Sequence, residues 1–239
     1  MALEDYTKYI EVDPLNHITP TAHHIDFIDR RDESAYLYSD KGTGYFRDFI
    51  HHLEFTRITH PATGPWSAIW CLANAVGDNM ALRDAGEIML FINVGSAPPR
   101  LCLSGWDGTD YIALAWHDIE LGTKYYLKIV KKGRSYKLHV YNNADRAPEH
   151  EYEWSPLETT LPADWSFRYI YACQSLNNGN PIEGEHDIDN LDLEAPPPPE
   201  EEVKPTLAEV LARVPATIWG ILALIIVVVV VAIYVARKK

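Results

Sequence analysis

The chain has few cysteines and little positive charge, and each shortage excludes a class of protein. Cys71, Cys102 and Cys173 stand far apart in apolar segments, without metal-ligand spacing. We expect small buried hydrophobic residues; one disulfide with a spare thiol is the alternative, and the sequence does not choose the pair. Lys and Arg number 21 against 34 Asp and Glu, a net charge of -13. Such a surface repels nucleic acid, so no nucleic-acid partner is expected.

Recognisable catalytic motifs and targeting signals are also missing. The sequence contains no phosphate loop, no HExxH motif and no Ser/His/Asp or Cys/His pattern, so we expect no enzymatic activity. The opening segment MALEDYTKYIEV has no charged start followed by an apolar stretch, so no cleavable signal peptide is expected. There is no Asn-x-Ser/Thr acceptor site, which weakly disfavours a glycosylated ectodomain.

What the chain does contain is a long apolar run near its end. Residues 218–235 read IWGILALIIVVVVVAIYV, and 18 residues of helix span about 27 Å, close to the hydrocarbon thickness of a bilayer. Trp219 and Tyr234 lie where aromatic rings prefer the lipid headgroups, and the basic residues Arg237, Lys238 and Lys239 follow. We therefore predict a single-pass membrane anchor, with the lipid bilayer as a partner.

The chain divides into five zones. We predict a globular domain over 1–194, a Pro/Glu-rich spacer over 195–205, a short amphipathic helix over 206–216, the transmembrane helix over 217–236 and a basic tail over 237–239. The membrane helix also offers a surface for homo- or hetero-oligomers.

Two observations on orientation conflict. The basic tail favours a cytoplasmic or interior C-terminus with the acidic domain outside, whereas the missing signal peptide favours a tail-anchored protein with a cytosolic domain. We favour an extracytoplasmic domain, on a cell or on a particle surface.

The globular domain has the pattern of an antiparallel β-protein. Eleven short segments with period-2 alternation, from His24–Ile28 to Asp187–Leu193, are separated by turn signals such as Asp107-Gly108 and Asn178-Gly179. The segment YYLKIVKKGRSYKLHVY is the clearest hairpin, with Lys132-Gly133 turning the chain back. The fold class is therefore all-β, an antiparallel two-sheet sandwich, followed by the C-terminal transmembrane helix.

This hairpin, the later WSFRYIYACQS strand and the closing IDNLDLEAP segment resemble concanavalin A-like jelly rolls, in particular the laminin-G-like group. The resemblance covers about residues 10–194 and extends to uncharacterised viral and environmental surface domains. It implies a jelly roll whose last strand returns beside the first. It also implies calcium at an acidic rim, for which Asp107, Asp187 and Asp189 are the candidates; a solvated strand face is the alternative.

Tryptophans in polar loops are the candidates for ligand contact. Trp106 lies in SGWDGTDY beside Asp107 and Asp110, and Trp154 lies in YEWSP. Sugar rings stack on such indoles while carboxylates accept their hydroxyls; a tryptophan folded over the sandwich edge is the alternative. Glu185, Asp187 and Asp189 only partly match the carboxylate pattern of glycosidases with this fold, which use carboxyl groups about 5 Å apart.

Three functions remain open. The preferred one is a surface-displayed recognition or adhesion module that binds a glycan or protein partner. A non-catalytic structural subunit of a membrane-associated complex or virion is the alternative, and a glycan-acting hydrolase is the third.

Overall fold

The computed structural model describes residues 3–59, 66–95 and 98–194. All of them belong to one compact unit, Met1–Pro197. The predicted spacer, amphipathic helix, transmembrane helix and basic tail lie outside the described residues. Within the described part, no helix has the length and apolar character needed to cross a membrane.

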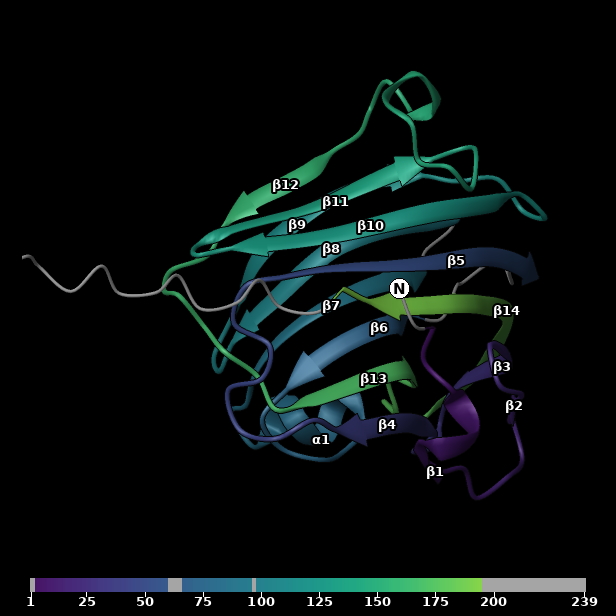
Figure 1. Cartoon of the computed structure of the whole chain (residues 1–239). Coiled ribbons are helices and arrows are strands. Elements are labelled where there is room, and N and C mark those ends of the chain that lie inside the picture. Colours follow the sequence, from purple (N-terminus) through teal and green to yellow (C-terminus); the bar gives the residue numbers. More distant parts are fainter. Residues whose placement is uncertain (1–2, 60–65, 96–97, 195–239) are drawn as a thin grey trace, which may run out of the picture. The chain divides into compact units, whose positions relative to one another are not determined.

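The described chain folds into two seven-stranded antiparallel sheets that face each other (Figure 1). Sheet 1 has the strand order β1-β4-β13-β6-β7-β8-β9, and sheet 2 has the order β12-β11-β10-β5-β14-β3-β2. The strands are β1 Ile10–Val12, β2 Ile18–Pro20, β3 His24–Arg31, β4 Tyr36–Asp40, β5 Phe49–Thr59, β6 Ser67–Ala73, β7 Ile88–Gly95, β8 Arg100–Asp107, β9 Tyr111–Asp118, β10 Lys124–Lys132, β11 Ser135–Tyr141, β12 Leu157–Thr160, β13 Tyr169–Gln174 and β14 Asn180–Leu193. Short helices occur at Tyr6–Lys8 (η1), Asn79–Asp84 (α1) and Pro148–His150 (η2).

The two sheets differ in what covers their outer faces. In sheet 1, β6 is buried at every position and β7 at all but its first, because a second apolar cluster that includes Leu82 of α1 covers the outer face. In sheet 2, β10 alternates between buried and partly exposed residues. Its inward residues Leu127 and Ile129 join the core between the sheets, whereas the outward ones are polar or partly exposed. Sheet 2 therefore presents an open, polar outer face.

The all-β sandwich prediction is confirmed, and the best-predicted hairpin is present. β10 and β11 pair antiparallel from Tyr126–Tyr141 to Lys132–Ser135, so the turn consists of Gly133 and Arg134, with Gly133 at φ 54°. Each of the eleven predicted strands overlaps an observed one. The three missed strands, β1, β2 and β12, have only three or four residues each, too few for a periodic signal.

The closing strand returns beside the N-terminal region, as predicted. β14 lies between β3 and β5, with Ile188 opposite Ile25 and Phe55, and Leu3 forms an isolated bridge to Asp192. Ile188 and Leu191 are buried, and Leu193 is half-buried. The strand is longer than predicted, because it begins at Asn180 rather than at Asp187.

Candidate functional site

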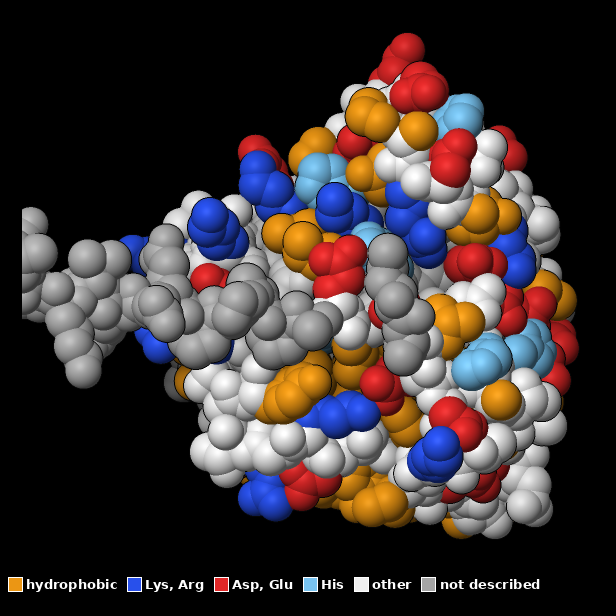
Figure 2. Space-filling view, in the orientation of Figure 1, with side chains coloured by type: hydrophobic (Ala, Val, Ile, Leu, Met, Phe, Trp, Pro, Cys, Tyr) orange, Lys and Arg blue, Asp and Glu red, His pale blue; other side chains and the backbone are white. Residues whose placement is uncertain are grey.

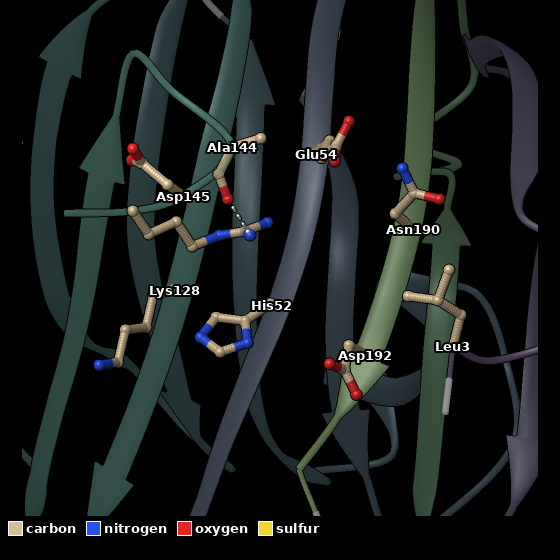
Figure 3. Close-up of a pocket in the computed structure, with 9 residues that line it drawn as sticks. Leu3, His52, Glu54, Lys128, Ala144, Asp145, Asn190 and Asp192 are labelled. Carbon is tan, nitrogen blue, oxygen red and sulfur yellow. Dashed lines mark hydrogen bonds between the residues drawn. The ribbon is translucent and has the colours of Figure 1, made fainter. Parts of the chain in front are cut away.

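The open face of sheet 2 is hollowed by a pocket of about 550 Å³ (Figure 3). Its floor is formed by strands β5, β10 and β14, and the loop after β11 overhangs one side. Figure 2, which views this face, shows basic, acidic and histidine side chains gathered over these strands. The lining residues are Leu3, His52, Glu54, Lys128, Ala144, Asp145, Arg146, Asn190 and Asp192. Both hydrogen-bond donors and acceptors therefore converge on one hollow.

Strand register places three of these side chains in one row. Lys128 of β10 is the register partner of His52 of β5, and His52 is the partner of Asp192 of β14. Figure 3 shows the imidazole of His52 between the ammonium group on one side and the carboxylate on the other. Neighbouring strands lie about 4.8 Å apart, so the row spans about 10 Å.

A β-bulge in β14 shapes the end of this row. The register with β5 shifts between Asp189 and Asp192, and Asn190 adopts φ 52°, in the left-handed region that Asn tolerates best among residues other than glycine. The extra residue lets Asn190 and Asp192 both line the pocket while Leu191 enters the core. Bulges commonly re-aim side chains beside functional sites.

Asp192 is the least satisfied group in the pocket. The residue is 6 % exposed, and its Oδ1 is buried without a hydrogen-bond partner among the described residues. A buried polar atom left unpaired costs roughly 1–3 kcal/mol, more if it is charged. The residue also lines the open pocket, so its carboxylate is a candidate acceptor for a donor from a ligand.

Arg146 ties the overhanging loop to the sheet. Its Nε donates to the carbonyl of Leu127 at 3.3 Å, Nη2 to that of Leu53 at 3.4 Å and Nη1 to that of Ala144 at 3.0 Å. Burial lowers the pKa of the guanidinium, partly offset by Glu54 and Asp192. A fixed positive charge therefore lies at the pocket wall.

His52 is a neutral imidazole at physiological pH. Burial, reinforced by the positive charges of Arg146 and Lys128, lowers the pKa of His52 to about 4. It can therefore donate a hydrogen bond through one ring nitrogen and accept one through the other without adding charge.

The predicted ligand residues Trp106, Asp107 and Asp110 lie together at the β8–β9 turn, away from the pocket lining. The Asp107 carboxylate accepts from the backbone N–H groups of Thr109 and Asp110, both at 2.9 Å, and these bonds hold its pKa below the usual range. The Arg83 guanidinium lies 4.5 Å from the Trp106 ring centroid. The Asp107 carboxylate and the Trp106 ring thus have local partners, whereas Trp106 Nε1 is buried without a hydrogen-bond partner among the described residues. Ligand binding here stays a prediction.

Trp154 lies elsewhere, stacked on His117 with ring centroids 4.2 Å apart and packed against the main core. Trp106 pairs with Tyr111 of β9, whereas the partner of Trp154, His117, lies six residues further along the same strand. Six residues of strand span about 20 Å. The structure therefore does not bring the two tryptophans into one site.

The three predicted calcium ligands are also separated. Asp107 belongs to sheet 1, whereas Asp187 and Asp189 belong to β14 of sheet 2. Among the described residues, the group whose ligand atoms approach within 4.8 Å is His24, Asp26 and Asp187. One imidazole and two carboxylates fall short of the six to eight oxygens that calcium prefers.

Asp189 is already engaged in hydrogen bonds. Its carboxylate contacts His24 Nδ1 at 2.5 Å and Lys124 Nζ at 2.8 Å. Burial lowers the pKa of His24, but the hydrogen bonds to Asp189 and Asp26 outweigh that effect and raise it. The imidazole of His24 and the ammonium group of Lys124 therefore already contact the Asp189 carboxylate that was predicted to bind calcium.

The pocket was not predicted from the sequence. The sequence does carry a weak signal for it: two pairs of polar residues, each separated by one apolar residue. These pairs are His52 with Glu54 and Asn190 with Asp192. Alternation of this kind shows that the residues share an outer face, but it does not show which strands are neighbours.

Comparison with known proteins establishes the fold alone. No protein-family model matches the sequence, and no curated protein matches it. Among solved structures, a functionally unknown protein from Saccharomyces cerevisiae is similar with a TM-score of 0.51 and 10% identity, over 81% of this chain and 100% of that one. The VIP36 exoplasmic/lumenal domain, in its Ca2+/Man3GlcNAc-bound form, is similar with a TM-score of 0.51 and 12% identity, over 82% and 87%.

A mutant of the GH43 protein BlXynB from Bacillus licheniformis is similar with a TM-score of 0.53 and 9% identity; the match covers 81% of this chain and 39% of that one. These likenesses agree with a concanavalin A-like jelly-roll sandwich.

Proposed function

We propose that this protein is a glycan-binding module whose ligand occupies the pocket on the outer face of sheet 2. The observation that carries the proposal is Asp192, a residue that lines the open pocket and whose buried Oδ1 lacks a hydrogen-bond partner among the described residues. A structural neighbour, the VIP36 domain, was solved with a mannose-containing glycan, which supports this choice of ligand.

The chemistry of the pocket suits a saccharide. Sugar hydroxyls both donate and accept hydrogen bonds, so a sugar-binding pocket needs side chains that accept and side chains that donate. Asp192 and Asn190 accept, Lys128 donates, and neutral His52 does either. A volume of about 550 Å³ lies within the range of small-molecule sites.

We propose binding without turnover. Glycoside hydrolysis needs two carboxyl groups with separate roles, one of which acts as an acid. In the pocket, Glu54 accepts from Lys124 Nζ at 3.3 Å, and Asp145 accepts from His150 and from the backbone N–H of Ala147. Asp192 therefore stands alone as a free carboxylate among the described lining residues.

A pocket-filling substitution tests the proposed site. Ala144 is an exposed lining residue, so Ala144→Trp should occlude the pocket without removing a polar group, and saccharide affinity should fall about tenfold or more. Ala85→Trp, at an exposed alanine that ends α1 on the other sheet, is the matched control. The measurement is calorimetric titration of the full chain with a saccharide panel. Equal affinity in both variants would place the site elsewhere.

We further propose that the module is held at a membrane by residues 217–236 and displayed outside the cytoplasm. The acidic domain and the Pro/Glu-rich spacer support display away from an anionic surface, and the basic tail supports an interior C-terminus. The described strands and core end before the spacer begins.

Truncation after Pro205 should therefore give a soluble protein with the β-type circular dichroism of the full chain, because the core that the described residues form extends only to Leu193. Membrane flotation should be seen for the full chain and lost in the fragment. An insoluble or unfolded fragment would contradict this division.

Calcium can be tested at the Asp187–Asp189 end of the open face. Because Lys124 occupies Asp189 Oδ2, calcium should raise the melting temperature of the Lys124→Met variant more than that of the wild type. Lys132→Met, an exposed lysine on the same strand, is the control. Melting curves of all three proteins that do not change between calcium and chelator would exclude calcium binding here.

A further inference from the structure

Four titratable side chains form a rectangle on strands β3 and β14, outside the pocket lining. His24 of β3 lies opposite Asp189 of β14, and Asp26 lies opposite Asp187. On each strand the residue between the two is buried in the core, so all four side chains share the outer face of sheet 2. Like charges directly opposite each other destabilise a sheet, so the Asp26–Asp187 pair needs a positive partner.

Both ring nitrogens of His24 face carboxylates. Nδ1 lies 2.5 Å from Asp189 Oδ1, and Nε2 lies 3.0 Å from Asp26 Oδ1. A neutral imidazole carries one proton, which satisfies only one of these two acceptors. The other nitrogen therefore needs a second proton or a metal ion between itself and the carboxylate.

The position of Asp187 favours the metal ion over the proton. A proton on Nε2 is shared with Asp26 alone, and Asp187 accepts no hydrogen bond from any of the described residues. A divalent cation between the strands would contact the imidazole and both carboxylates at once. It would also remove the repulsion between the two opposed aspartates.

We infer that His24, Asp26 and Asp187 bind a zinc ion through Nε2 of the imidazole and one oxygen of each carboxylate. The three ligand atoms lie within 4.8 Å of one another. Zinc bonds of about 2.0–2.1 Å in a tetrahedral site hold the ligand atoms about 3.3 Å apart, so small side-chain rotations complete the site. One nitrogen and two oxygens suit zinc, with the fourth position open to water, whereas calcium prefers six to eight oxygens.

Asp189 is a positioning residue in this site and not a ligand. A carboxylate that accepts from the Nδ1–H group of a histidine directs Nε2 towards the metal, and zinc sites commonly contain this arrangement. Lys124 Nζ donates to Asp189 Oδ2 at 2.8 Å and so holds the carboxylate against the imidazole. The zinc site lies outside the pocket lining, and the inference does not rest on saccharide binding.

The experiment titrates the full chain with zinc chloride by calorimetry, and with Co²⁺ as a spectroscopic substitute for zinc. We expect one zinc ion per chain, and an affinity lower by about a hundredfold in His24→Gln and in Asp187→Asn. Asp189→Ala should lower the affinity by about 10- to 100-fold, as the loss of such outer partners does. The visible absorption of four-coordinate Co²⁺ should be lost in His24→Gln.

His23→Gln is the matched control. His23 is the exposed neighbour of His24, and its Nδ1 contacts the carbonyl oxygen of Glu4 at 2.9 Å, so this variant should bind zinc as the wild type does. Asp187→Asn removes no hydrogen bond to the described residues, so it tests the site even if His24→Gln folds poorly.

Three results would overturn the inference. Zinc affinity that is the same in the wild type and in Asp187→Asn would place the ion on other histidines. Absence of zinc binding by the wild type would leave no site, and calcium that binds as tightly as zinc would exclude a zinc site. None of these results changes the expected effect of Ala144→Trp on saccharide binding, so the two proposals fail separately.

Discussion

Lowering the pH from 7.5 to 4.5 should reduce the free energy of unfolding by roughly 3 kcal/mol through His51 alone. This residue is 1 % exposed, stacked on Phe49 with ring centroids 4.4 Å apart, and its Nδ1 accepts the indole N–H of Trp70 at 3.2 Å. Burial, with smaller contributions from His52 and Lys41, lowers the pKa of His51 to about 3.

The direction of the effect follows from proton binding. An unfolded histidine takes up a proton as the pH falls through about 6.5, whereas the folded one stays neutral until about pH 3. Between these values the unfolded state binds more protons, so stability is present above pH 6.5 and is lost as the pH falls. Protonation of Nδ1 would also break the bond from Trp70.

Chemical denaturation at a series of pH values checks this expectation. His51→Gln, which keeps an acceptor for Trp70 but does not titrate, should lose about 3 kcal/mol of acid sensitivity relative to the wild type. His150→Gln is the control, because His150 is partly exposed and its pKa is raised by Asp145. Identical acid slopes for the wild type and His51→Gln would show that His51 does not titrate as buried.

The parts of the fold that depend on neighbouring residues along the chain could be predicted from the sequence. The β10–β11 hairpin could be predicted because alternating Tyr126, Lys128 and Val130 and a Gly133 turn are neighbours along the chain. The return of β14 beside the N-terminal strands came from resemblance, since no local rule sets a pairing between Ile25 and Ile188.

The pocket depends on features that local patterns do not encode. Lys128, His52 and Asp192 become neighbours only because β5 is inserted between β10 and β14, strands that are distant in sequence. The bulge at Asn190 and the position of Arg146 over the sheet are likewise tertiary. The sequence does not reveal this bulge, because the asparagine that it contains is also common in ordinary turns.

Whether a tryptophan in a polar loop can bind a ligand depends on contacts that the sequence does not show. Trp106 lies under Arg83 and Trp154 stacks on His117, and both contacts can be explained by packing. A sequence shows that an aromatic residue is flanked by Asp and Gly, but not whether its ring face is free. Burial of a carboxylate such as Asp192 is visible only in three dimensions.

Asp192→Asn should lower saccharide affinity about tenfold or more while leaving the free energy of unfolding within about 1 kcal/mol of the wild type. Two opposing effects of similar size act on stability: neutralising the side chain relieves the burial of an unpartnered charge, and it removes the attraction to Arg146, which lies beyond ion-pair distance.

Asp189→Asn, on the same strand, is the matched control with the opposite pattern. Its carboxylate holds Lys124 at 2.8 Å and His24 at 2.5 Å, so its loss should lower stability by about 1 kcal/mol and preserve saccharide binding. Calorimetric titration and denaturant unfolding of both variants provide the comparison. If Asp192→Asn unfolds the domain as readily as it lowers affinity, Asp192 is a structural residue and the ligand lies elsewhere. A retained affinity would remove the observation on which the proposed function rests.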